Sequence, residues 1–600
     1  MTDSAGPQPG STAGAAPSQP PPLPPPPSGT ATGVAYAIFE GGGARGITHI
    51  GAVKALERER IEIIGVAGAS AGAIVAALVA AGCSADQLYD PQAGTDILTR
   101  RRTGDGKPLT PTALLGGTAW ASFVKLQGRL GQLARHGRWL LVLLVVAVVL
   151  AVIAGRPGAL LLVLVLVGLL IWLGPLVWQL RPLAGRLGLF DSRGMADQLN
   201  AILREQLAAH YRDNMEFDRK VPDIVTFADL DPVLGGVKQC RPLKIVVSDV
   251  TKGTVCIFDR NTPGAAVADA VAASAAIPLF FAPPAVRGGP QAVFADGGLV
   301  SNLPVWVFAG DKRRQERDLA TTIPIFAFKL DDAPPAADSG AGGGPAGLAA
   351  LGHHITRVAR TGIFGSQAVI AEVLPDVVPI ALPTRLGTLQ FDVGRDAANG
   401  AYHDGLRAAA IALARRRLER QLLDALLAGI LAEVQARVAA LMPGAPVRVR
   451  ASLLDPDRRY TRDVESFRIV ASAGMAGDPD AALSIDSRSR GAPSAWVARR
   501  PVYVDDLLDG NAGSRHMTPQ EDALVWRGLK SLIAVPIFAR PEFADVPAQL
   551  PHRILCLDAD APLKPLFEQA EFGAWLISET VILSYASIEE IISERIPEGL

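Results

Sequence analysis

The pentapeptide Gly68–Gly72, which reads Gly-Ala-Ser-Ala-Gly, constrains the fold more than any other part of this 600-residue chain. It lies between an apolar, strand-like run at 61–67 and an alanine-rich, helix-like run at 73–81. A Gly-x-Ser-x-Gly pattern in that context is typical of a nucleophile elbow, a sharp turn that lifts the serine hydroxyl out of the backbone while small neighbours let the chain close around it. Ser70 is therefore a candidate nucleophile.

A glycine-rich loop precedes the elbow by about thirty residues. It follows the apolar run 34–39, leads into a helix-like segment at 47–57, and consists of Gly41, Gly42, Gly43, Ala44, Arg45 and Gly46. Consecutive glycines expose backbone N–H groups, and a helix N-terminus adds partial positive charge, so the loop is suited to hold an anion. The anion is either a phosphate or the oxyanion of a tetrahedral acyl intermediate. Neither Gly-Lys-Ser/Thr nor Gly-x-Gly-x-x-Gly is matched, which favours the oxyanion over phosphate; a purely structural turn is the other alternative.

A third motif follows much later, at Asp296-Gly297-Gly298. The aspartate comes after a short apolar run and before two glycines, a pattern that predicts an exposed carboxylate at a strand end. The segment 273–281, which reads Ala-Ser-Ala-Ala-Ile-Pro-Leu-Phe-Phe, comes shortly before it.

Taken together, and in this order, the three motifs resemble the patatin-like phospholipase family over about residues 34–413. The resemblance implies a Ser–Asp dyad in place of the usual triad, with Ser70 as nucleophile and Asp296 as its base. It implies an oxyanion hole at Gly41–Ala44. The motif is completed by supporting residues, namely Arg45, Gly46, Gly68, Gly72, Gly297 and Gly298.

The histidines and cysteines offer no competing chemistry. None of the eight histidines has a context that marks it as a triad member, and His49 has a packing or capping role as its simplest interpretation. The four cysteines form no Cys-x-x-Cys pair, and paired metal-ligand spacing is absent. The sequence therefore predicts neither a metal nor a cofactor.

Two long apolar runs, 139–154 and 159–180, flank the turn-forming segment Gly155–Gly158. At 1.5 Å per residue the second run reaches about 33 Å, enough for a bilayer core, whereas the first reaches only about 24 Å. We expect a transmembrane helical hairpin at 139–180, with a re-entrant or monotopic wedge as the alternative and a buried soluble hairpin as a third.

Charge placement predicts the orientation of this hairpin. No Asp or Glu occurs at 106–190, and basic residues flank both sides, namely Lys125, Arg129, Arg135, Arg138, Arg181 and Arg186. The positive-inside rule then places both flanks, and with them the catalytic and C-terminal domains, in the cytoplasm. The same topology reunites Ser70 with Asp296. A formal net charge of −1 gives no drive toward nucleic acid.

The remaining pattern completes the fold class. Residues 1–30 form a Pro-rich tail that we expect to be disordered. Strand and helix patterns at 31–416 predict an α/β catalytic domain with a mainly parallel sheet sandwiched by helices. An amphipathic helix at 422–441 and several short strands then resemble a GAF domain at 421–600, a smaller α+β module. This resemblance implies a regulatory role, with dimerisation and an unidentified small-molecule effector.

We therefore expect a membrane-tethered lipid acyl hydrolase, of phospholipase or lysophospholipase type, that works through an acyl-enzyme. Its partners are membrane lipid as substrate and the bilayer as support. Two alternatives stay open: a lipid acyltransferase, and a membrane-bound sensor or scaffold whose hydrolase fold is catalytically silent.

Overall fold

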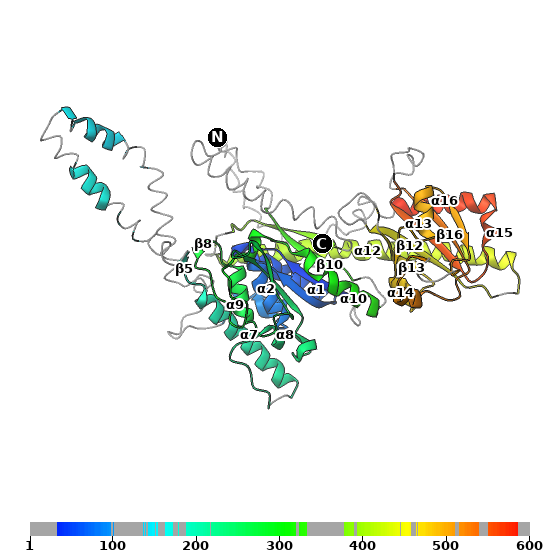
Figure 1. Cartoon of the computed structure of the whole chain (residues 1–600), viewed down its shortest axis with the longest axis horizontal. Helices are drawn as coiled ribbons and strands as arrows, with labels where there is room; N and C mark the ends of the chain where they lie inside the picture. Colours follow the sequence, from blue (N-terminus) through cyan, green and yellow to red (C-terminus); the bar gives the residue numbers. More distant parts are fainter. Residues whose placement is uncertain are drawn as a thin grey trace, which may run out of the picture.

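The structure is a computed structural model of the chain (Figure 1). It describes residues 33–97, 100, 136, 139, 142–150, 152–153, 163–171, 174, 178, 188–215, 218–319, 323–332, 377–388, 390, 393–444, 446–457, 464, 466–509, 515–538 and 550–585. The predicted N-terminal tail at 1–30 lies outside these residues.

A seven-stranded mixed sheet forms the centre of the N-terminal part. Its order is β11-β10-β1-β2-β6-β7, with β9 also paired to β6. The strands are β1 (Gly33–Phe39), β2 (Ile61–Gly68), β6 (Leu243–Asp249), β7 (Thr254–Phe258), β9 (Phe294–Ala295), β10 (Ile325–Asp332) and β11 (Val377–Thr384). All pairings from β11 to β6 are parallel, whereas β7 and β9 pair antiparallel to β6. The predicted α/β class with a mainly parallel sheet is therefore confirmed.

Side chains alternate along each strand, so apolar residues point to both faces of this sheet, and both faces are covered. On β1, Ala37 and Phe39 enter the larger core, while Tyr36 and Ile38 enter a second core on the other face. The larger core is closed by α1 (Gly46–Arg58), α2 (Ala71–Ala80), α7 (Arg193–Asp213), α9 (Val267–Ser274) and the start of α12 (Arg395–Leu441). The opposite face is covered by η4 (Val305–Phe308), which leads into α10 (Ala309–Leu319).

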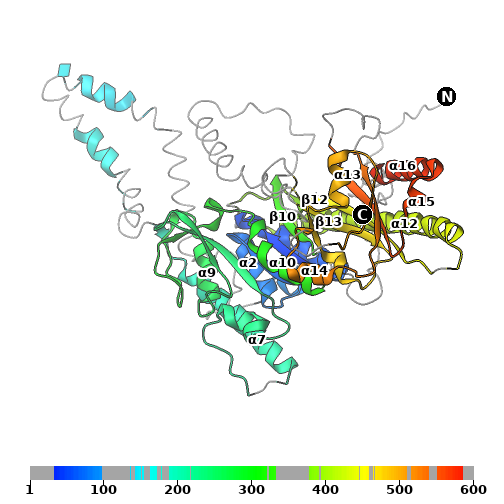
Figure 2. The same cartoon turned by 45° about the vertical axis from the view of Figure 1, so that its right-hand side comes forward.

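Helix α12 runs through the boundary predicted between the two domains. It has 47 residues, or about 70 Å at 1.5 Å per residue. Its start packs on α1, with Tyr402 and Leu406 in the larger core, whereas Leu427 and Val434 belong to a separate C-terminal core. Figures 1 and 2 show it passing from the blue and green part of the molecule into the yellow-to-red part. The helix predicted at 422–441 is thus the second half of a longer one.

The C-terminal part is built on a six-stranded antiparallel sheet of order β14-β13-β12-β17-β16-β15. The strands are β12 (Val449–Asp457), β13 (Ser466–Ala473), β14 (Ser484–Asp486), β15 (Val502–Asp505), β16 (Ser531–Ile537) and β17 (Arg553–Ala559). One face packs on α12, α15 (Lys564–Phe567) and α16 (Ala570–Tyr585), and the other on α13 (Ala492–Ala498). This arrangement agrees with the expected α+β module; its assignment as a GAF domain stays a prediction.

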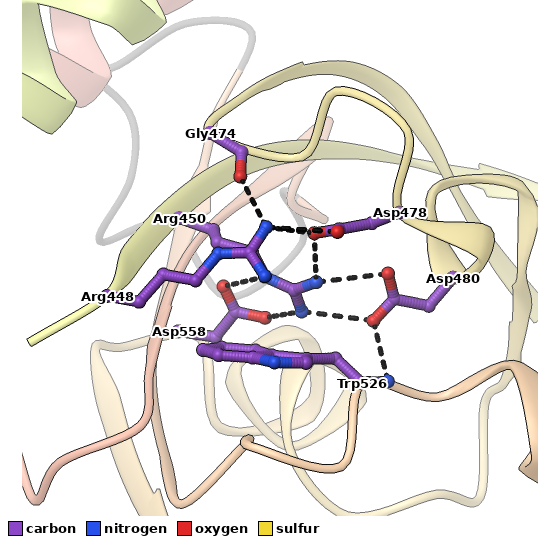
Figure 3. A network of polar contacts seen from close by, with 7 residues as sticks. All are labelled: Arg448, Arg450, Gly474, Asp478, Asp480, Trp526 and Asp558. Carbon is purple, nitrogen blue, oxygen red and sulfur yellow. Dashed lines mark hydrogen bonds and ion pairs between the residues drawn. The ribbon is translucent and has the colours of Figure 1, made fainter.

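A buried arginine joins several segments of this module (Figure 3). Arg450, on β12, is 1% exposed, and its guanidinium donates to three carboxylates, those of Asp478, Asp480 and Asp558. Its Cζ atom also lies 4.4 Å from the centroid of the Trp526 ring. A buried charge is tolerated only when it is paired and hydrogen-bonded, and this network meets both conditions.

The predicted transmembrane hairpin is not confirmed. Within the described residues, no helix combines the length and apolar character needed to cross a membrane. Much of 139–180 lies outside those residues, and the continuous helical parts described there are 142–150 and 163–171.

The crossing of α1 and α12 depends on two glycines. A Cβ atom added to Gly405 would lie 2.0 Å from Thr48 O, and one added to Gly51 would lie 2.0 Å from Tyr402 O. The two helix backbones therefore approach more closely than any side chain permits.

We expect Gly405→Ala to lower the free energy of unfolding by about 1–3 kcal/mol, because the helices must separate. Gly400 lies on the same helix with open space around it. Gly400→Ala should therefore stabilise by about 0.5–1 kcal/mol, since alanine is the better helix former. Thermal and urea unfolding of the two variants check the difference. Equal shifts would contradict the close crossing.

Candidate active site

The nucleophile elbow forms where the sequence predicts it. Ser70 lies between β2 and α2 with φ 51° and ψ −124°, a strained conformation for a residue other than glycine. A Cβ atom on Gly68 would lie 2.3 Å from Gly72 O, and one on Gly72 would lie 2.2 Å from Phe39 O. Both glycines are therefore required by the backbone packing of the turn.

Asp296 meets Ser70 across 226 positions of sequence. Ser70 Oγ donates a hydrogen bond of 2.8 Å to Asp296 Oδ2, and the Gly298 N–H donates one of 2.7 Å to Oδ1. Strand β9 brings the aspartate here by pairing with β6, which is the neighbour of β2. A Cβ atom on Gly297 would lie 2.1 Å from Val246 O, so the turn after the aspartate also depends on glycine.

Burial raises the pKa of Asp296 to about 6, although the hydrogen bonds from Ser70 and Gly298 act in the opposite direction. The carboxylate is 7% exposed and the serine 8%. Both residues therefore have little access to solvent, and the Asp296 carboxylate is more basic than that of an ordinary aspartate.

The glycine loop lies beside this pair. A Cβ atom on Gly41 would lie 3.0 Å from Ser70 Cβ. The N–H of Gly41 donates to Asn302 O and that of Ala44 donates to Thr388 O, so neither is available to an oxyanion. Within the described residues, the N–H groups of Gly42 and Gly43 have no acceptor. Two of the four N–H groups predicted to form the oxyanion hole are therefore already hydrogen-bonded within the fold, and the oxyanion hole itself stays a prediction.

Arg45 braces the loop, in agreement with its interpretation as motif support. Its Nη1 forms a 3.0 Å ion pair with Asp332, and its Nε donates to Gly42 O at 3.4 Å. Gly43 has φ 59°, and a Cβ atom there would lie 2.0 Å from Thr388 O. Gly46, the first residue of α1, is less crowded, because its nearest neighbour would be Ala71 Cβ at 3.6 Å.

No histidine of the described residues is hydrogen-bonded to Ser70 or Asp296. His49 is fully buried behind the loop, with its Nε2 2.8 Å from Glu40 O. Burial lowers its pKa to about 4, so the ring is neutral at physiological pH. His353 and His354 lie outside the described residues.

The sequence analysis missed one polar side chain of the elbow, Ser274. The Ser70 N–H donates to Ser274 Oγ at 2.9 Å, and this hydroxyl donates to Val246 O at 2.7 Å. Ser274 is fully buried at the end of α9. A hydroxyl among small apolar residues was the available signal, but its partner could not be read from the sequence.

Comparisons with known proteins give a family match over this region. A family model, "Patatin-like phospholipase", matches residues 37–309, which include both Ser70 and Asp296. The uncharacterized protein YqhO of Bacillus subtilis is 24% identical over 288 residues, or 46% of this chain and 67% of YqhO.

Solved structures show a more distant likeness. VipD of Legionella pneumophila matches 70% of this chain and 81% of its own, with 16% identity and a TM-score of 0.29. The type III effector ExoU, known from Pseudomonas aeruginosa, matches 70% of this chain and 62% of its own, with 15% identity and a TM-score of 0.30. On the family match, residues 37–309 form a patatin-like phospholipase domain, and the chain is a serine lipid acyl hydrolase.

Proposed function

We propose that the chain is a membrane-attached phospholipase or lysophospholipase that cleaves acyl esters with a Ser70–Asp296 dyad. The observation that carries the proposal is the buried 2.8 Å hydrogen bond from Ser70 Oγ to Asp296 Oδ2. A base within hydrogen-bond reach of the nucleophile is the arrangement that activation requires.

In the proposed reaction, Asp296 Oδ2 accepts the Ser70 proton as Oγ attacks the ester carbonyl carbon. The N–H groups of Gly42 and Gly43 hold the resulting oxyanion. The tetrahedral intermediate collapses as Asp296 returns the proton to the departing alcohol, which leaves an acyl-enzyme on Ser70. Asp296 then takes a proton from water, the hydroxide attacks the acyl carbonyl, and the fatty acid is released as Ser70 regains its proton.

The two proposed alternatives differ in what becomes of the acyl group. A lipid alcohol in place of water would make the enzyme an acyltransferase, which gives an acylated alcohol and no free fatty acid. A silent scaffold would give neither product. Product analysis with and without an added lysophospholipid acceptor separates the three cases.

Attachment to membranes rests on the apolar segment 139–180. In its described parts, large apolar side chains are about half exposed, with Val145 at 54%, Val149 at 49% and Leu164 at 60%. Such surface is costly in water and favourable in lipid. Basic residues on both flanks suit the cytoplasmic leaflet, on which the catalytic and C-terminal parts would then lie.

The C-terminal module would act as a regulator. A cavity of about 280 Å³ has apolar walls that include Leu454, Ile469 and Leu483, and Arg450 and Asp558 contribute polar groups. Its size suits a small-molecule effector. Dimerisation through this module is the second regulatory role proposed. It would appear as a change from dimer to monomer when residues after about 441 are removed.

The dyad is tested by replacing each member. We expect Ser70→Ala and Asp296→Asn each to lower kcat on a phospholipid ester by at least about 10³-fold, with the double variant no worse, because the two residues act as a unit. Asp223→Asn, which changes an exposed aspartate, is the control. Turnover near wild type in either single variant would refute the dyad.

The pH profile tests the state of the base. Asp296 must be deprotonated to accept the serine proton, so activity is full above its pKa of about 6 and is lost as pH falls through it. We expect kcat/KM to fall about tenfold per pH unit below that value. The midpoint should move little with temperature, as for a carboxyl group, whereas a strongly temperature-dependent midpoint would indicate a histidine.

Membrane attachment is tested by replacing 139–180 with a short Gly/Ser linker. We expect the protein to lose at least about tenfold in binding to phosphatidylcholine–phosphatidylglycerol vesicles, since the exposed apolar side chains of this segment are removed. Hydrolysis of a water-soluble short-chain ester should persist. A control replaces 333–347, a Gly- and Ala-rich segment without long apolar side chains. Unchanged vesicle flotation would contradict attachment through 139–180.

A further inference from the structure

Asn302 links the loop that carries the base to the loop that carries the proposed oxyanion donors. It lies six residues after Asp296 and is 8% exposed. Its Nδ2 donates to Gly41 O at 3.1 Å and to Glu40 Oε1 at 2.9 Å. Because both partners are acceptors, only the NH₂ end of the amide fits this position.

The Gly41 residue is held on both sides by the same asparagine. Its N–H donates to the backbone oxygen of Asn302 at 3.1 Å, while its carbonyl accepts from the Asn302 side chain. Asn302 Oδ1 also occupies the space beside Gly41, where an added Cβ atom would approach it to 2.3 Å. Gly41 thus has little freedom to rotate.

Peptide planarity carries this restraint to the next residue. The Gly41 carbonyl and the Gly42 N–H belong to one trans peptide, in which they point in opposite directions. When Asn302 holds the carbonyl on its own side, the Gly42 N–H is directed away from Asn302. Gly42 is one of the two loop residues whose N–H has no acceptor within the described part of the chain.

We propose that Asn302 is a positioning residue for acyl transfer, which sets the direction of the Gly42 N–H through its hydrogen bond to Gly41 O. This inference rests on the proposed function, because it takes Gly42 as an oxyanion donor. One loop, Asp296 to Asn302, would then orient both the base and the group that stabilises the developing charge.

Glu40 anchors the asparagine in turn. Its Oε1 accepts from Asn302 Nδ2, its Oε2 accepts from the Leu330 N–H at 2.6 Å, and its own N–H donates to Phe328 O at 3.1 Å. The contacts to β10 join the asparagine to the parallel sheet. This anchor allows the positioning role to be separated from a purely structural one.

The experiment measures kcat and KM on a water-soluble ester for Asn302→Ala, Asn302→Asp and the double variant Glu40→Gln/Asn302→Asp. The double variant can restore the bridge with its direction reversed. The amide introduced by Glu40→Gln can accept from the Leu330 N–H through its oxygen and donate through its NH₂ group to the carboxylate introduced by Asn302→Asp. The exchange also keeps the total charge of the pair. It cannot restore a donor to Gly41 O.

We expect all three variants to lose about 10- to 100-fold in kcat, with KM within about threefold of wild type, because the lost interaction acts on the developing oxyanion. The double variant should regain part of the melting temperature lost in Asn302→Asp, because the bridge to residue 40 is restored, without regaining kcat. Asn399→Ala is the control. It removes an amide on α12 that accepts a hydrogen bond from the Tyr89 hydroxyl, and it should leave both constants unchanged.

Recovery of kcat in the double variant, or kcat within threefold of wild type in Asn302→Ala, would overturn the positioning role. If Asn302→Ala does not fold, the double variant alone decides between the outcomes. Failure of the proposed function looks different: wild type would then hydrolyse no ester, or would keep its activity in Ser70→Ala.

Discussion

The hydrogen bond between Ser70 and Asp296 is the interaction on which the rest of this structure depends. Ser70 and Asp296 follow β2 and β9, two strands that are far apart in sequence and both pair with β6. The chain between them includes the whole apolar segment 139–180. The fold therefore brings Ser70 and Asp296 within hydrogen-bond reach although this segment separates them in sequence.

The site is held in a strained and desolvated form by its surroundings. Ser70 adopts a positive φ, and the hydroxyl of Ser274 holds its N–H in place. Removing Asp296 from water raises its pKa, which brings it closer to the range in which a base works at neutral pH. Strain and desolvation both cost stability, and the close backbone contacts at Gly68, Gly72 and Gly297 maintain them.

The sequence predicted the parts of the site that depend on local pattern. Ser70 and Asp296 stand at strand ends in short motifs, and the apolar runs before them match β2 and β9. The use of each N–H in the glycine loop depends instead on distant segments. The backbone oxygen of Asn302 accepts from the Gly41 N–H, and that of Thr388, after β11, accepts from the Ala44 N–H.

The helix at the predicted domain boundary also depends on distant contacts. No glycine or proline at 416–421 marks the end of a helix, and α12 continues through the predicted domain boundary because both of its halves find a core to pack against. The short strands β14 and β15 carry too few residues for a clear alternating pattern.

The most direct test of this account is to map where a fluorophosphonate reacts with the full-length protein. The account predicts a single adduct on the peptide that contains Ser70, absent from Ser70→Ala and strongly slowed in Asp296→Asn, as measured by intact-protein and peptide mass spectrometry. An adduct on another serine, or full hydrolytic activity with Ser70 unmodified, would contradict it.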